Sequence, residues 1–242
     1  MTHLVRTLAA TYYDGHHIPP HAHPWAQLIY AASGVMRVQA GGVLWLAPPA
    51  RAVWAPAGVT HEIRARGDFA MRTLYLAPGL TTGLPAACRA IEVSPLLREL
   101  ILKTVGIGML RADEPAHRRL AEMTVDELAA AEVLPLALPL PADPRALRVA
   151  ERLQADPADA AELPALARDA GASARTLQRL FLEETGLGFA LWRRRLRLLH
   201  AAGLLAAGAS VTTAGLDAGY ASASAFIAAF KAQFGRTPAR MR

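Results

Sequence analysis

The first 80 residues alternate short apolar runs with turn signals, a pattern that predicts β-structure. Three such runs are Gln27–Tyr30, Val35–Val38 and Val43–Leu46. The turn signals around them are Ser33-Gly34, Gly41-Gly42, Pro48-Pro49 and Pro56-Ala57-Gly58. Because short strands with regular turns are typical of antiparallel double-sheet folds, we expect a barrel or a jelly roll.

Helical spacing replaces this pattern between residues 94 and 131. Ser94 offers an N-cap, Pro95 suits the first helical position, and apolar residues then recur at helical intervals. A second helix is predicted from Pro115 to Ala131. Prolines at positions 135, 139, 141 and 144 then exclude a continuous helix and predict a linker.

The rest of the chain is helical in pattern and contains a repeat. The positions Ser173, Leu177, Phe181 and Gly186 recur 49 residues later as Ser222, Phe226, Phe230 and Gly235. Spacing of four places the apolar side chains on one helix face, serine can cap the helix, and glycine can end it. A short helix and a glycine turn precede each repeat, which predicts two helix-turn-helix units in tandem.

These patterns predict an α+β chain of two domains. The N-terminal domain is a β-barrel followed by helices, and the C-terminal domain is all-α with two helix-turn-helix units. The predicted boundaries are 1–85 for the barrel, 86–133 for the helical segment, 134–143 for the proline-rich linker and 144–242 for the helix-turn-helix domain.

Charge is unevenly placed along the 242 residues. Residues 1–142 carry 12 Lys/Arg and 11 Asp/Glu, a balance of +1, whereas residues 163–242 carry 11 Lys/Arg and 4 Asp/Glu, a balance of +7. A basic final third is typical of a phosphate-binding module, although charge of this kind also serves solubility. The start of the chain lacks the features of a signal peptide, and Cys88 is the single cysteine, so we expect a cytoplasmic protein with no membrane partner.

The segment from about Pro144 to Arg242 resembles the AraC/XylS-type DNA-binding domain. The motif that carries the first unit is Leu177-Gln178-Arg179-Leu180-Phe181. Gly219-Tyr220 and the stretch from Phe226 to Pro238, which ends Phe-Gly-Arg-Thr-Pro, carry the second. The resemblance implies that the two units enter successive major-groove segments and are joined by a long helix, here about Phe189 to Leu205.

Arg175, Gln178 and Arg179 lie on a helix face separate from the apolar one, where arginine suits guanine and glutamine suits adenine. The second recognition helix offers few side chains for base edges, so we expect it to position on phosphates or thymine methyls. Arginines of the joining helix are expected to contact phosphate or to pair with nearby carboxylates. The predicted DNA contacts are Ser173, Arg175, Thr176, Gln178, Arg179, Arg193, Arg195, Ser222, Ser224 and Lys231.

The N-terminal domain carries a second constellation. His21-x-His23-x-x-x-Gln27 with Gly34, followed by Pro56-x-Gly58-x-x-His61, resembles the two cupin motifs, with Gln27 where cupins usually have glutamate. The resemblance covers about residues 10–80 and implies a double-stranded β-barrel. Strand parity puts His21 and His23 on one face, together with Trp25 and Gln27 if the strand stays regular.

Three imidazoles and one side-chain oxygen suit a divalent Zn, Ni, Fe or Mn ion, although glutamine in place of glutamate removes a charge from the site. The predicted metal ligands are therefore His21, His23, Gln27 and His61. Alternatively the histidines are polar groups in a pocket for an organic effector, lined by Trp25, Trp45, Trp54 and Tyr75, or those aromatics are barrel core.

The predicted function is a sequence-specific transcriptional regulator whose cupin domain senses a small ligand or a metal ion. Its expected partners are double-stranded operator DNA, a small-molecule effector, a second copy of the chain and, for an activator, RNA polymerase. The resemblance favours dimerisation through the helices of residues 86–133. The alternative is a metal-dependent cupin enzyme, a dioxygenase or isomerase with a helical appendage.

Overall fold

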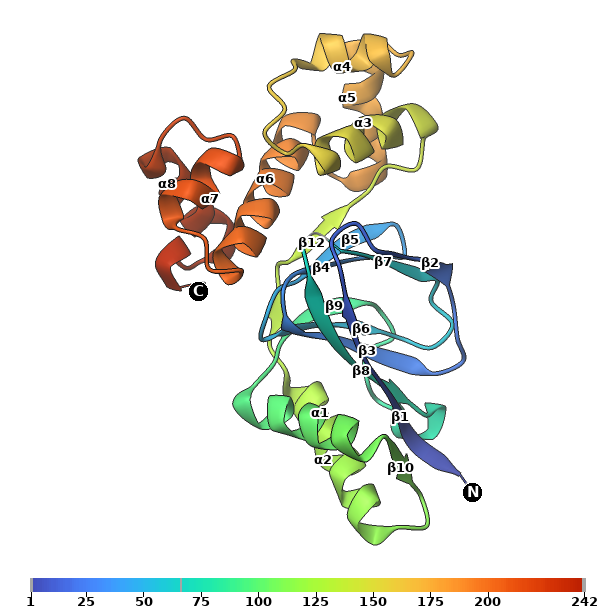
Figure 1. The fold of residues 1–242 in the computed structure, drawn as a ribbon. Helices are drawn as coiled ribbons and strands as arrows, with labels where there is room; N and C mark the ends of the chain where they lie inside the picture. Colours follow the sequence, from blue (N-terminus) through green and yellow to red (C-terminus); the bar gives the residue numbers. More distant parts are fainter. Residues whose placement is uncertain (1, 66, 241–242) are drawn as a thin grey trace. The chain divides into compact units, whose positions relative to one another are not determined.

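A computed structural model describes residues 2–65 and 67–240. The chain forms two compact units, one of residues 1–41 and 45–137 and one of residues 42–44 and 138–242. The first is rich in antiparallel sheet and the second is helical (Figure 1). This confirms the α+β fold expected from the sequence.

Two sheets form the framework of the N-terminal unit. The larger has the strand order β10-β1-β8-β3-β6-β9-β11 and the smaller the order β12-β5-β4-β7-β2. The first six strands are β1 (His3–Tyr12), β2 (His17–His21), β3 (Ala26–Ser33), β4 (Met36–Ala40), β5 (Val43–Ala47) and β6 (Arg51–Ala55). The others are β7 (His61–Ala65), β8 (Phe69–Leu76), β9 (Arg89–Glu92), β10 (Met109–Arg111), β11 (Val133–Leu134) and β12 (Ala137–Pro139).

Strand β3 is buried on both faces, because the larger sheet is packed on two sides. Ile29 and Ala31 belong to a core shared with Met36 and Ile63 of the smaller sheet. Leu28 and Tyr30 point the other way, into a core that contains residues of two helices, α1 (Pro95–Ile107) and α2 (Pro115–Ala130). A continuous apolar strand is the expected result of burial on both faces.

The segment from 134 to 143 is not wholly irregular. It contains the end of β11 and the whole of β12, and the amide of Leu136 donates to the carbonyl of Leu134. The amide of Leu46 donates to Leu136, and the amide of Leu140 donates to Gly42. The prolines rule out a helix here, but they do not prevent this short extended pairing along β5.

The C-terminal unit consists of six helices and a short 3₁₀ turn, η2 (Pro238–Arg240), in its described residues. The helices are α3 (Pro144–Ala155), α4 (Leu163–Asp169), α5 (Ala174–Thr185), α6 (Phe189–Ala206), α7 (Val211–Asp217) and α8 (Ala223–Phe234). Helix α4 contacts α5 and α7 contacts α8, and α6 lies between the two pairs in the chain (Figure 1). Another short 3₁₀ turn, η1 (Pro78–Leu80), lies in the N-terminal unit.

Local capping chemistry sets the ends of the two recognition helices as the sequence predicted. Ser173 accepts a hydrogen bond from the amide of Thr176, and Ser222 accepts one from Ala225. Gly186 and Gly235 end α5 and α8 in the left-handed conformation, with φ of 69° and 70°. These caps satisfy amides and carbonyls that a helix terminus otherwise leaves unpaired.

No helix within residues 2–65 and 67–240 has the length and apolar character needed to cross a membrane.

Candidate functional sites

Three histidines converge at one end of the smaller sheet. His21 ends β2 and pairs in register with His61, the first residue of β7. His23 lies in the short connection to β3, and each imidazole offers a nitrogen within 4.8 Å of those of the other two. The ring centroids of His21 and His61 are 4.4 Å apart, and those of His23 and His61 are 5.2 Å apart. The three predicted imidazole ligands are therefore brought together.

Each of these rings is oriented by a backbone carbonyl. The Nδ1 atoms of His21, His23 and His61 lie 2.9, 2.5 and 2.9 Å from the carbonyl oxygens of Pro19, Trp25 and Val59. A carbonyl oxygen can only accept, so Nδ1 is the protonated nitrogen in all three rings. In a neutral ring the Nε2 atom then carries the free lone pair, which is the form of imidazole that binds a metal.

Gln27, on β3, presents an oxygen to two of these rings. Its Oε1 atom lies 2.9 Å from Nε2 of His23 and 2.8 Å from Nε2 of His61. Its Nε2 atom donates to the hydroxyl of Thr73, which in turn donates to the carbonyl of Leu28, both at 2.9 Å. Because the Thr73 proton is used on a carbonyl, Thr73 must accept from the amide nitrogen of Gln27, and this fixes Oε1 toward the histidines.

Burial favours the neutral form of His61. His61 is buried, and this desolvation lowers the pKa of its imidazole, with a further lowering from the neighbouring His21 and His23. The hydrogen bond to Val59 acts in the opposite direction. Nε2 of His61 and Oε1 of Gln27 lie 2.8 Å apart, and burial disfavours the doubly protonated ring that would place a proton between them.

The four aromatic residues predicted to line an effector pocket do not lie together. Tyr75 packs edge-on against His23, with ring centroids 5.1 Å apart, and Trp45 packs against the core between the two sheets. Trp54 lies in the core that contains α1 and α2, and its indole nitrogen donates to Pro85. Trp54 therefore packs in the core on the face of its strand opposite to the histidines, which agrees with the alternative that these aromatics are core, and an effector pocket stays a prediction.

Trp25 does not share a strand face with His21 and His23 either. The chain leaves extended structure after His21 and re-enters it at Ala26, so strand parity does not extend across this stretch. The guanidinium carbon of Arg6 lies 4.7 Å from the centre of the Trp25 ring, a cation–π contact.

On the first recognition helix, α5, the predicted base readers lie on the exposed face. Arg175, Gln178 and Arg179 are exposed, whereas Leu177 and Phe181 are buried. Arg179 donates to Glu183 at 2.6 Å, an exposed pair one turn apart that contributes little stability and leaves the arginine available to DNA. Ser173 and Thr176 act at the helix cap, where their hydroxyl oxygens are 2.9 Å apart.

The second recognition helix, α8, exposes small and apolar side chains. Ser224 and Lys231 are exposed, as is Ile227 to 38%. Helix α7 approaches it closely, since a Cβ atom at Gly215 would lie 3.0 Å from the ring of Phe226. The surface of α8 therefore offers fewer side chains for hydrogen bonds to base edges than the surface of α5, as the sequence indicated.

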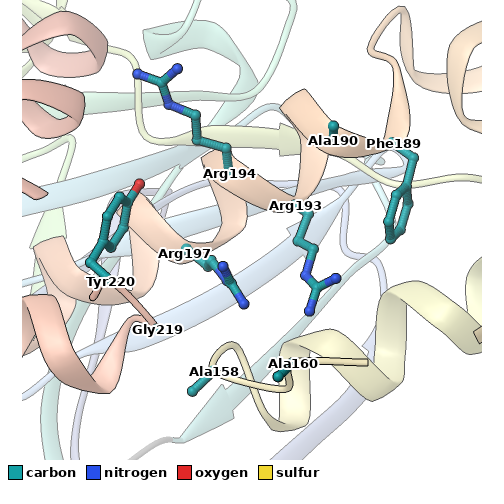
Figure 2. Close-up of a pocket in the computed structure, with 9 residues that line it drawn as sticks. All are labelled: Ala158, Ala160, Phe189, Ala190, Arg193, Arg194, Arg197, Gly219 and Tyr220. Carbon is teal, nitrogen blue, oxygen red and sulfur yellow. The ribbon is translucent and has the colours of Figure 1, made fainter. Parts of the chain in front are cut away.

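Two arginines of α6 hold the loop between α3 and α4 by hydrogen bonds that the sequence did not reveal. Arg193 donates to the carbonyls of Asp159 and Ala161, and Arg197 donates to those of Pro157 and Asp159. Figure 2 shows both guanidinium groups turned toward the loop that carries Ala158 and Ala160. Their partners are thus backbone carbonyls rather than carboxylates, and phosphate contact by Arg193 stays a prediction.

Comparison with known proteins agrees with both halves of this architecture. Residues 3–137 match the family described as "AraC-like ligand binding domain", and residues 166–242 match one described as "Helix-turn-helix domain". The HTH-type transcriptional regulator NimR of Escherichia coli is 35% identical over 222 residues, covering 92% of this chain and 81% of NimR. The chain belongs to the AraC family of transcriptional regulators.

Other proteins are similar to all or part of this AraC-type chain. The regulator RipA of Corynebacterium glutamicum is 43% identical over 100 residues, 41% of this chain and 30% of RipA. Among solved structures, ToxT from Vibrio cholerae aligns over 98% of this chain and 97% of its own, with 10% identity and a TM-score of 0.41. The similar sequences are named as regulators, which supports a DNA-binding regulator with a ligand-binding N-terminal domain over a cupin enzyme.

Proposed function

We propose that a divalent metal ion bound by His21, His23, His61 and Gln27 controls DNA binding by this AraC-type regulator. The observation that carries the proposal is the convergence of three imidazole rings and one amide oxygen. Oε1 of Gln27 lies within 2.9 Å of two imidazole Nε2 atoms whose protons are on Nδ1. Facing lone pairs repel unless a proton or a cation lies among them, and burial disfavours the proton on His61.

The set of ligand atoms favours a transition metal. Imidazole nitrogen suits Zn, Cu, Fe and Ni, and a neutral amide oxygen adds a weaker fourth ligand. With metal–ligand bonds of about 2.1 Å, neighbouring ligands lie about 3.0 Å apart around an octahedral ion and about 3.4 Å apart around a tetrahedral one. The spacings of 2.8 and 2.9 Å at Gln27 are close to those between neighbouring ligands of one divalent ion.

We infer that the barrel is of the cupin type and that regulation is a shift between two presentations of the DNA-binding units. A bound ion can shift that equilibrium only as far as its affinity differs between the two. Dimerisation through α1 and α2 is part of the proposal, since Leu96 and Met123 of these helices are 46% exposed. For an activator, RNA polymerase is the further partner.

The test is metal analysis of the purified full-length protein, with operator binding measured before and after chelation. We expect stoichiometric metal in the wild type, its loss in His21→Ala/His61→Ala, and a changed operator affinity after chelation. His16→Ala is the control, because His16 is exposed and lies outside the cluster. Unchanged metal content in the double variant would place the ion elsewhere, and DNA binding indifferent to chelation would refute metal control.

One observation favours a second candidate, an organic effector with a hydrogen-bond acceptor. The indole nitrogen of Trp45 is buried and has no hydrogen-bond partner among the described residues, although the ring packs against the core between the sheets. A buried donor without a partner is costly, so an acceptor on a bound molecule would satisfy it. If metal is absent, a Trp45→Phe variant that loses the response to a candidate effector identifies this site instead.

A further inference from the structure

A cavity of about 540 Å³ opens along α6 in the DNA-binding unit (Figure 2). Arg193, Arg194 and Arg197 line one wall of it, and Gly219 and Tyr220, in the turn before α8, line another. Ala158 and Ala160 come from the loop between α3 and α4. The cavity is thus built by the joining helix, by the first helix-turn-helix unit's leading loop and by the turn of the second unit.

The positive charge of this cavity is not matched by carboxylates. None of the described residues that line it is acidic, and none of the three arginines forms an ion pair within the described part of the chain. The carbonyl partners of Arg193 and Arg197 satisfy N–H groups without cancelling charge. Asp159, which supplies one of these carbonyls, uses its carboxylate on Arg152 and on the amide of Ala161.

Arg193 carries its charge in an unfavourable environment, because it is partly buried and lies near a second arginine. Burial lowers the pKa of its guanidinium, and the charge of Arg197 lowers it further, with partial relief from Asp159. Its Nε atom is buried and has no hydrogen-bond partner among the described residues. A bound anion would relieve the crowding of positive charge.

Gly219 makes the close packing at this wall possible. A Cβ atom there would lie 3.1 Å from the guanidinium carbon of Arg197 and 3.3 Å from Cα of Ala158. Its φ of 77° is also the left-handed conformation that glycine adopts without strain. The glycine of the Gly219-Tyr220 motif therefore lets the second unit's turn lie against the arginine that fixes the first unit's loop.

We propose that this cavity binds a phosphate group. The exposed guanidinium of Arg194 offers a fork that matches phosphate geometry, and the charges of Arg193 and Arg197 add to the attraction for an anion. Tyr220, a half-buried residue, lies on the facing wall, and desolvation raises the pKa of its phenol. The volume is of the size that small-molecule sites have, and Phe189 with the alanines gives it an apolar side. The phosphate belongs to a free phosphorylated small molecule, and its binding does not depend on the metal proposed above. Contact with the DNA backbone is the alternative that the second arm of the test distinguishes.

The cavity offers one arginine that can be changed without loosening the loop. Arg194 is exposed, and Figure 2 shows it extended from α6 on the side away from Ala158 and Ala160. Arg194→Gln therefore removes a charge of the site while Arg193 and Arg197 keep their carbonyl partners. Arg168→Gln removes the same charge from an exposed position on α4 in the same unit, outside the cavity lining, and is the matched control.

In the first arm, adenosine monophosphate and inorganic pyrophosphate are titrated calorimetrically into the full-length protein. For a free phosphorylated molecule we expect binding to the wild type, at least a tenfold loss in Arg194→Gln and less than a twofold change in Arg168→Gln. In the second arm, random duplex DNA is titrated over a range of salt concentrations. For a backbone phosphate we expect the slope of log Kd against log salt to fall by about one in Arg194→Gln.

Arg119→Gln, an exposed arginine of α2, controls for net charge in the second arm. A change in the first arm supports a site for a free phosphorylated molecule. A change in the second arm alone assigns the cavity to the DNA backbone and overturns the proposal. No effect of Arg194→Gln in either arm, or an equal effect of its control, overturns the proposal. Operator binding that survives chelation would refute metal control while leaving both arms interpretable, so the two proposals fail separately.

Discussion

Thr73→Val should weaken metal binding although Thr73 is not a metal ligand. The hydroxyl is fully buried, accepts from Nε2 of Gln27 and donates to the carbonyl of Leu28. Valine has nearly the same shape, so the change removes these two hydrogen bonds and little else. The amide nitrogen of Gln27 is then left buried without its acceptor, which costs about 1–3 kcal/mol of unfolding free energy.

The loss of these hydrogen bonds also allows the side-chain amide of Gln27 to flip, which exchanges the positions of its oxygen and nitrogen. With its NH₂ toward His23 and His61, the side chain would donate to the two Nε2 lone pairs and hold the site closed to a cation. Outer residues that orient a ligand typically change metal affinity about 10–100-fold when they are removed, and we expect a loss in that range. Stability and metal affinity should therefore fall together in this one variant.

Thr104→Val is the matched control, because Thr104 is also fully buried but its hydroxyl has no hydrogen-bond partner among the described residues. We expect no loss of stability and no change in metal affinity there. Urea unfolding followed by tryptophan fluorescence gives the first quantity, and calorimetric titration of Ni²⁺ or Mn²⁺ into chelated protein gives the second. Equal behaviour of the two variants would refute the assigned orientation of Gln27.

Two further substitutions test the DNA-binding unit. Arg179→Ala should cost about 1–3 kcal/mol at a specific operator and relax the preference at one base position, measured by binding to single-base operator variants. An equal loss on random DNA would instead make Arg179 a phosphate contact. Gly219→Ala should destabilise this unit by at least about 1 kcal/mol more than Gly186→Ala, measured by thermal unfolding. Both glycines have positive φ, 77° and 69°, but a Cβ atom meets Arg197 only at Gly219 and nothing within 4 Å at Gly186; equal losses would show that the contact does not matter.

Features governed by neighbours in sequence could be predicted from the sequence. Ser173 and Ser222 cap their helices and Gly186 and Gly235 end them, because a cap involves only residues a few positions apart. The buried faces of α5 and α8 follow from the spacing of Leu177, Phe181, Phe226 and Phe230 for the same reason.

Features governed by strand register could not be predicted from the sequence. Thr73 orients Gln27 only because β8 pairs with β3 in a register that sets Gln27 opposite Tyr75 and Ile29 opposite Thr73. The pairing of β6 with β3 likewise sets Trp54 opposite Leu28, so that Trp54 packs toward α1 and α2. A single strand gives no sign of which buried face a tryptophan takes. The alternation of side chains along a strand could not be applied to residues 22–25, because they belong to neither β2 nor β3.

The histidine site places a limit on how an ion could act. Its ligands come from the end of β2, from the connection to β3, from β3 itself and from the start of β7, so an ion would fix the connection that carries His23. Nδ1 of His23 is already held by the carbonyl of Trp25, and Arg6 lies over the Trp25 ring, so order at His23 extends to β1. A bound ion would therefore stabilise the connection between β2 and β3 within the N-terminal unit. Coupling is reciprocal, however, so an ion that changes operator affinity by some factor must itself bind more or less tightly by that same factor on the operator. Ordering of residues 22–25 alone is therefore not sufficient for regulation: the ordered and disordered forms of this connection must also differ in how well the whole protein binds DNA.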